Sequence, residues 1–213
     1  MKLVWSPERA SKAYIDTVKS CELDLQQSGE SELISALAGG WNAKMIVEAC
    51  SHGGAGATSV GLAIAAHHTG GRYICMVPDE STRQDYLNAV NSAGVSPPPE
   101  VVVGPAEEAV AELVGIDFLL VDGRCKGFGR LIRLAKLSHR GAVLVCRRTV
   151  AGFRWGGVLG STTRIVRSVE LPVGEGLDIA YAAGNTNSGS TKSNRRWIKH
   201  VDQKSGEEHL IRG

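Results

Sequence analysis

The chain alternates between short apolar runs and helix-like segments from residue 44 to residue 146, and this alternation limits the fold more than any other feature. Five apolar runs are predicted strands, at residues 44–50, 72–77, 100–103, 117–121 and 142–146. Helical patterns follow the first four of them, at residues 58–68, 82–93, 106–114 and 129–137. Short connections between strands and helices predict a parallel sheet with helices on both of its faces.

The pattern changes near the end of this region. Two strand-like runs, residues 164–171 and 177–183, are separated only by Pro172-Val173-Gly174-Glu175-Gly176. Five residues cannot hold a crossover helix, so the two runs must pair as an antiparallel hairpin. A parallel sheet that ends in such a hairpin is a narrower prediction than a general Rossmann-like fold, because a dinucleotide-binding domain normally continues with parallel strands.

Both ends of the chain add to this sheet. Ser6-Pro7-Glu8 has an N-cap residue, a proline at the first helical position and an acid in the first turn, which predicts a helix to about residue 21. A second helix, residues 31–38, is expected to stop at Gly39-Gly40. Residues 1–184 are therefore predicted to form one domain with N-terminal helices. Residues 185–213 are predicted to be a polar linker and a basic tail, whose alternation suggests a marginal hairpin.

Composition narrows the classes of protein that fit. At 213 residues one α/β domain is the simplest count, and a net charge of +2 gives no argument for nucleic acid as a partner. No window approaches the roughly 20 apolar residues of a membrane span, and the N-terminus lacks the apolar core of a signal peptide. The five cysteines are scattered without a CxxC pair, which is typical of reduced, intracellular proteins. We expect a cytoplasmic location, with the nucleus left open.

The stretch KMIVEACSHGGAGATSVGLAI, residues 44–64, is the predicted binding centre. A buried strand, a glycine turn and a helix N-terminus together offer unpaired backbone N–H groups to a nucleotide-like ligand. Candidate binding residues in this stretch are Glu48, Ser51, Gly53, Gly54, Gly56 and Thr58. Glu48 either bonds the ligand amine or loop N–H groups, or it is a solvated carboxylate at the end of the strand.

The order of motifs resembles the class I S-adenosylmethionine-dependent methyltransferases, and within them the small metal-dependent O-methyltransferases of the caffeoyl-coenzyme A type. The likeness covers roughly residues 31–183. It is carried by IVEAC with the glycine loop, YICMV with PDE, Gly104-Pro105-Ala106, DFLLVDG and LPVGEGLDIAYA. The full chain also resembles a plant family of uncharacterised proteins with this predicted fold, which implies no particular reaction.

This resemblance implies a doubly wound, three-layer α/β sandwich with strand order 3-2-1-4-5-7-6 and strand seven antiparallel. It implies that S-adenosylmethionine, or its demethylated product, lies over the C-terminal ends of the strands. The segment from Glu48 to Thr58 would then wrap the methionine part. Val77 or Asp79 would lie near the ribose, Gly104, Pro105 and Ala106 would flank the adenine, and Asp122 would lie near the methyl group.

Two departures from the family pattern bear on chemistry. The acid that usually ends the second strand and binds the ribose hydroxyls is Val77 here, and Asp79 follows two residues later. Relatives hold a divalent ion with an aspartate after strand four and an Asp-Asn pair after strand five, but Arg147-Arg148 replaces that pair, so no metal is expected. The two arginines either clamp a phosphate or carboxylate, or pair with Asp122 or a helix end. Asp122 is either a base or substrate contact, or it caps the turn at Gly123-Arg124.

Two functions fit these features. The first is a methyltransferase-like protein that binds S-adenosylmethionine, needs no metal if it is active, and has an unassigned acceptor. The second is a catalytically inactive scaffold or ligand sensor that acts through protein partners. The sequence assigns no catalytic residue. A small-molecule ligand is expected as a partner. The oligomeric state is left open, with a homodimer as one candidate because the relatives commonly pair.

Overall fold

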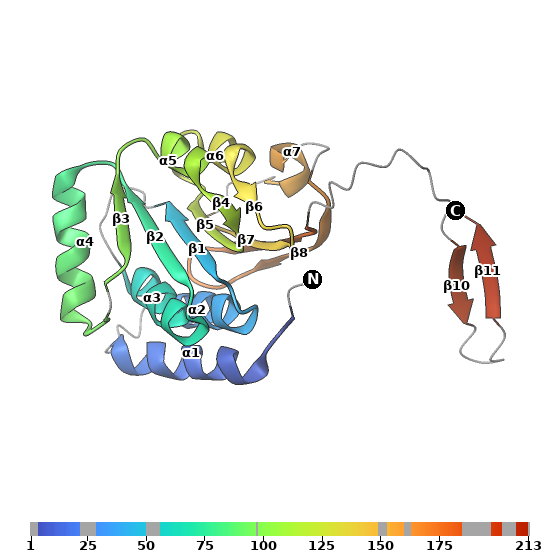
Figure 1. Cartoon of the computed structure of the whole chain (residues 1–213), viewed down its shortest axis with the longest axis horizontal. Helices are drawn as coiled ribbons and strands as arrows, with labels where there is room; N and C mark the ends of the chain where they lie inside the picture. The colour runs from blue at the N-terminus through green and yellow to red at the C-terminus, as the bar shows by residue number, and fades with distance from the viewer. Residues whose placement is uncertain are drawn as a thin grey trace.

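The computed structural model describes residues 4–21, 29–49, 56–96, 98–148, 153–159, 163–184, 197–201 and 208–212. Its centre is a seven-stranded sheet with the order β3-β2-β1-β5-β7-β9-β8 (Figure 1). The strands of this sheet are β1 (Met45–Ala49), β2 (Arg72–Val77), β3 (Glu100–Val103), β5 (Phe118–Asp122), β7 (Ala142–Arg147), β8 (Ile165–Leu171) and β9 (Leu177–Ala182). The first five run parallel, and β9 is antiparallel to both β7 and β8. The predicted sheet order and the antiparallel strand are therefore confirmed.

Helices cover both faces of the sheet and make the three layers (Figure 1). On one face, α2 (Glu30–Gly40), α3 (Ala57–Thr69) and α4 (Glu80–Ser92) pack around a core that includes Ile46, Leu62 and Tyr86, with α1 (Pro7–Ser20) against α2 and α3. On the other face, α5 (Ala106–Glu112), α6 (Phe128–Leu134) and α7 (Trp155–Leu159) enclose a second core that includes Leu119 and Leu144. Strands with both faces buried explain the continuous apolar runs of the sequence.

The glycine pair at residues 39 and 40 forms the end of α2, and Gly40 is its last residue. A Cβ added to Gly39 would be 2.9 Å from the Cβ of Ala13, and one added to Gly40 would overlap the ring of Trp5. The predicted end of this helix is therefore confirmed, and the two glycines also allow α1 and the residues before it to approach α2 closely.

Two predicted helices end early. Residues 106–114 and 129–137 were expected to be helical, but α5 and α6 give way to β4 (Val114–Ile116) and β6 (Lys136–Leu137), which pair in a separate two-stranded sheet. Gly115 has a φ of +85°, which does not continue a helix, and Ile116 is fully buried. A left-handed glycine followed by a core residue thus changes the direction of the chain.

Outside the large sheet, β10 (Trp197–Val201) and β11 (Glu208–Arg212) form an antiparallel pair in which Trp197 faces Arg212. The predicted linker, residues 185–194, lies outside the described residues, and the division of the chain at residue 184 stays a prediction. Among the helices of the described residues, none is both long enough and apolar enough to cross a bilayer.

Candidate ligand site at the C-terminal edge of the sheet

The parallel strands end at one edge of the sheet, and most of the predicted site residues lie there. Val77 at the end of β2 faces Val103 at the end of β3, and Asp122 at the end of β5 faces Arg147 at the end of β7. The Gly104 N–H donates a hydrogen bond of 2.9 Å to the Val77 carbonyl, so the connections after β2 and β3 are adjacent. Ligands of open α/β sheets bind at this edge.

Two glycines leave open backbone at this edge. Gly56 is the N-cap of α3, and Gly104 precedes α5 with a φ of +136°, a conformation that favours glycine. Among the residues that the structure describes, a Cβ added to either glycine would meet no heavy atom within 4 Å. Pro105 is the N-cap of α5 and Ala106 is its first residue. A ligand can therefore approach the main chain closely at the starts of both helices.

Glu48 is not a solvated residue at the end of a strand. Its side chain is only 3% exposed, and its Oε2 accepts hydrogen bonds from the Ser59 hydroxyl, at 2.8 Å, and from the Tyr73 hydroxyl. The Tyr86 hydroxyl in turn donates to the Tyr73 oxygen at 2.8 Å. The Glu48 carboxyl group thus links β1 to α3, β2 and α4 inside the core. A charged residue within an apolar strand was the only sequence signal for this network.

Asp122 is held by Arg147, the last residue of β7, and by Arg148, which follows it. Its side chain is 2% exposed, and its Oδ2 lies 2.5 Å from Arg148 Nη2 and 3.6 Å from Arg147 Nε. Its Oδ1 accepts a hydrogen bond of 2.9 Å from the Arg124 N–H, which caps the turn after β5. Of the alternatives for the arginines, pairing with Asp122 is therefore the one that the geometry supports.

Arg147 also ties this cluster to the helices on one face of the sheet. Its Nη1 donates to the Thr58 hydroxyl at 3.4 Å and lies 3.7 Å from the carboxylate of Glu30, at the start of α2. Burial raises the pKa of Glu30 above its usual range, although the two neighbouring arginines oppose this shift. Thr58, Asp122 and Arg147 are thus brought together from β5, β7 and the first turn of α3.

Glu175 completes the charges around Asp122. Its Oε2 lies 2.9 Å from Arg124 Nη2 and 3.7 Å from Arg148 Nε. Together with Glu30 and Asp122, it balances the three arginines of this cluster. Arg148 has a φ of +55°, so a side chain other than glycine is held in the left-handed region here.

A divalent cation does not fit beside Asp122. Two guanidinium groups already supply the positive charge at this carboxylate, and a metal ion placed there would lie close to both of them. Across the residues that the structure describes, no group of three or more His, Cys, Asp or Glu side chains is arranged to hold a metal.

Of the remaining candidates, two follow or end β2 and the others lie outside the described residues. Val77 is buried and carries no polar side-chain atom, whereas Asp79 is exposed and N-caps α4 through hydrogen bonds from the Thr82 N–H, at 2.7 Å, and the Thr82 hydroxyl, at 2.8 Å. This cap explains why α4 begins two residues before the predicted start of its helix. Ser51, Gly53 and Gly54 lie outside the described residues.

Comparison with known proteins places the chain in a family. The family model described as "Protein of unknown function (DUF1442)" matches residues 1–213. The chain belongs to this family. No curated protein matches it.

Solved structures with the same fold as this DUF1442 protein include three methyltransferases. The O-methyltransferase TomG of Streptomyces achromogenes, in complex with SAM, is 23% identical, with 85% of this chain and 92% of TomG covered and a TM-score of 0.56. The SAH-bound methyltransferase PaMTH1 of Podospora anserina is 14% identical, covering 83% and 88%, with a TM-score of 0.56. A protein of Staphylococcus aureus that is described as a caffeoyl-CoA O-methyltransferase is 15% identical. The match covers 72% of this chain and 82% of that chain, with a TM-score of 0.54. These likenesses establish the methyltransferase fold of the DUF1442 chain.

Proposed function

We propose that this protein binds S-adenosylmethionine, or its demethylated product, over the C-terminal edge of the sheet, and that any methyl transfer it performs is independent of metal. The observation that carries the proposal is the pair of open glycines, Gly56 and Gly104, at this edge of a methyltransferase fold. Solved proteins of the same fold hold SAM or SAH.

The described residues suggest how such a ligand would be held. The open backbone at Gly56 would receive the methionine part, beside Thr58 at the start of α3. The segment from Gly104 to Ala106 would flank the adenine. The Val77 side chain offers no hydrogen bond to ribose hydroxyls, so Asp79 would take that role. Asp122 would lie near the methyl group. Ser51, Gly53 and Gly54 remain predicted contacts of the methionine part.

The charges at Asp122 support chemistry without a metal. Arg147 and Arg148 neutralise this carboxylate in place of a cation. Methyl transfer to an acceptor that is already nucleophilic needs little acid–base machinery, because holding the two reactants in line supplies much of the rate. The acceptor class is left unassigned.

One observation favours the second function, an inactive scaffold or ligand sensor acting through protein partners. The acids that could face the ligand are engaged by the chain's own groups: Glu48 by Ser59 and Tyr73, Asp122 by two arginines and Asp79 by Thr82. A pocket closed by such contacts would keep the fold without the reaction.

We further propose a homodimer in the cytoplasm of a plant cell, and light scattering of the purified chain tests the dimer.

Calorimetric titration of the purified full chain with S-adenosylmethionine, S-adenosylhomocysteine and NAD, with and without Mg²⁺, tests the proposal. We expect micromolar binding of the first two that Mg²⁺ does not change. Gly56→Leu places a side chain in the open space at the start of α3 and should weaken binding at least tenfold, roughly the effect of losing 1.4 kcal/mol. Asn91→Leu, on the exposed side of α4, is the control and should bind as the wild type does.

Three outcomes would contradict parts of this proposal. No binding of either adenosyl ligand at millimolar concentration refutes it and favours the protein-binding scaffold. Binding that requires Mg²⁺ refutes metal independence. Equal binding by the Gly56→Leu variant and the wild type refutes the position of the ligand at the start of α3.

A further inference from the structure

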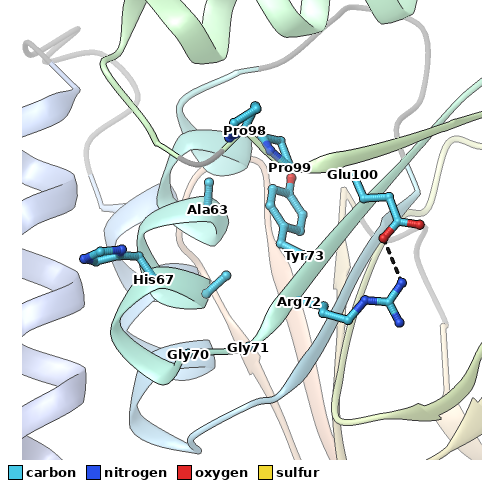
Figure 2. Close-up of a pocket in the computed structure, with 10 residues that line it drawn as sticks. Ala63, His67, Gly70, Gly71, Arg72, Tyr73, Pro98, Pro99 and Glu100 are labelled. Carbon is cyan, nitrogen blue, oxygen red and sulfur yellow. Dashed lines mark hydrogen bonds and ion pairs between the residues drawn. The ribbon is translucent and has the colours of Figure 1, made fainter.

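A cavity of about 350 Å³ lies at the other edge of the sheet, where the parallel strands begin. It is formed by the C-terminal half of α3, the first residues of β2 and the segment that leads into β3 (Figure 2). Its volume falls within the range of small-molecule sites, roughly 300–1,000 Å³. Because it lies at the opposite strand ends from Gly56 and Gly104, an inference about it does not depend on the function proposed above.

His67, Arg72 and Glu100 are the polar residues that line this cavity, and the rest of its wall is formed by glycines, alanines, prolines and the ring of Tyr73. Ala63 and Ala66 are three residues apart on α3, so their methyl groups lie on one face of the helix. Pro98 and Pro99 form another wall, and Figure 2 shows the ring of Tyr73 pointing toward Pro99 with Ala63 beside it. The Tyr73 hydroxyl is bonded to Glu48 and Tyr86, which holds this ring in place. A space between small side chains and rigid rings suits a planar ring system.

The mouth of the cavity carries an ion pair between Arg72 and Glu100, and Lys44 lies beside Gly70, one of the lining residues. Arg72 Nη2 lies 2.7 Å from Glu100 Oε2, and both side chains are more than half exposed. Lys44 Nζ donates to the Thr69 carbonyl and lies 4.0 Å from where a Cβ on Gly70 would be. An exposed ion pair contributes little to stability, so a ligand acid can share or replace Glu100 at small cost. The guanidinium group of Arg72 carries further N–H donors besides the one facing Glu100.

The backbone at this end of α3 does not compete for the ligand. The Gly70 N–H donates to the His67 carbonyl and the Gly71 N–H to the Ala66 carbonyl, so the end of the helix is capped from within. Neither Gly70 nor Gly71 has a side chain to block the opening. The cationic side chains that can meet a ligand acid are Arg72, which lines the cavity, and Lys44, which lies beside Gly70.

We propose that this cavity binds a small aromatic carboxylate, with one or two fused rings between Tyr73, the α3 alanines and the prolines, and its acid on Arg72. The apolar part of the wall selects the ring, and the guanidinium group of Arg72, with the Lys44 ammonium group beside Gly70, selects the acid. This site is separate from the edge that carries Gly56, Gly104 and Asp122.

The proposal is tested by titrating the purified full chain with indole-3-carboxylate and monitoring binding by ligand-observed NMR. We expect saturable binding in the micromolar to millimolar range that S-adenosylhomocysteine does not displace. Indole-3-carboxamide, which keeps the rings without the charge, should bind roughly tenfold more weakly, since a charge-assisted bond to Arg72 is lost. Cyclohexanecarboxylate, which keeps the charge without the flat rings, should also bind more weakly.

Three variants test whether the ligand binds in this cavity or elsewhere on the protein. Arg72→Gln should weaken indole-3-carboxylate binding roughly tenfold and leave carboxamide binding unchanged. Ala66→Leu should fill the cavity and weaken both ligands. Arg83→Gln removes an arginine from a comparable exposed ion pair with Glu80 on α4 and should change neither. The thermal unfolding midpoint of each variant shows whether it is folded.

The proposal is overturned if the wild type shows no saturable binding, or if acid and amide bind equally. It is also overturned if Arg72→Gln binds like the wild type, or if S-adenosylhomocysteine displaces the probe. Should Ala66→Leu fail to fold, the comparison of Arg72→Gln with Arg83→Gln and the two indole ligands still decides the question.

Discussion

Replacing Glu48 with alanine is expected to destabilise the fold well before it affects a ligand. The Glu48 carboxyl group accepts hydrogen bonds from Ser59 and Tyr73 in a site that is almost fully buried. Its removal leaves these two hydroxyl groups without that acceptor. A buried polar group that loses its partner costs about 1–3 kcal/mol, so two of them give about 2–6 kcal/mol.

An opposing effect reduces this sum. Burying a carboxyl group costs desolvation free energy, and the Glu48→Ala variant no longer bears that cost. We therefore expect the free energy of unfolding to fall by about 2–4 kcal/mol. In a domain of this size each kcal/mol lowers the unfolding midpoint by about 2–4 °C, so the midpoint should fall by about 4–16 °C.

Urea unfolding followed by circular dichroism measures this change. Glu112→Ala removes a glutamate from an exposed position on α5 and should change stability by less than about 0.5 kcal/mol. A double-mutant cycle with Tyr73→Phe adds a second readout. Since the two side chains are bonded to each other, the double variant should lose less than the sum of the single variants.

One result would refute this reasoning. If Glu48→Ala unfolds within about 0.5 kcal/mol of the wild type but no longer binds S-adenosylmethionine, Glu48 is a ligand contact and the hydrogen-bond network is not what it contributes. A loss of stability with ligand binding retained at low temperature supports the structural role.

Two further predictions concern titratable groups. Burial raises the pKa of Glu30, so the charged form is disfavoured in the folded state and wild-type stability is lost as the pH rises through the raised pKa. Glu30→Gln should therefore gain stability relative to the wild type between about pH 4 and neutral pH. A constant difference between the two proteins in urea unfolding across this range would contradict the prediction. Burial also raises the pKa of Cys146 to about 12, so this thiol should resist iodoacetamide at pH 8 in the folded protein. The partly exposed Cys21 and Cys125 should react first. Mass spectrometry after a short pulse of reagent checks the order of labelling, and early labelling of Cys146 would refute the prediction.

Local pattern and chain connectivity carried most of the fold. The predicted strand at residues 72–77 coincides with β2, and the one at 100–103 coincides with β3, because a buried parallel strand needs a continuous apolar run. The five residues between β8 and β9 left an antiparallel hairpin as the only connection. An error arose at Gly115, where the chain turns out of the predicted helix, because a glycine in sequence does not reveal whether it takes a left-handed conformation.

The candidate site was predicted less fully than the fold. The sequence placed Gly104 and Asp122 at strand ends and Gly56 in the connection after a strand, and thus all three at one edge of the sheet. It left open whether Glu48 faces a ligand or solvent, and the structure has it hydrogen bonded to Tyr73, 25 positions away. The pairing of Arg147 and Arg148 with Asp122 was one of two alternatives, and no sequence pattern chose between them.

The sequence by itself therefore determined the order of strands and helices, the antiparallel hairpin and the edge at which strand ends meet. These features follow from periodicity and from the length of connections, which are local properties of the chain. Only the tertiary structure decided which groups surround each charge. Arg147 bonds Thr58 from 89 positions away, and the cavity beside Tyr73 joins α3, β2 and the segment before β3. Such neighbours are set by packing of the whole domain, because hydrogen bonds and ion pairs depend on distances that sequence spacing does not fix.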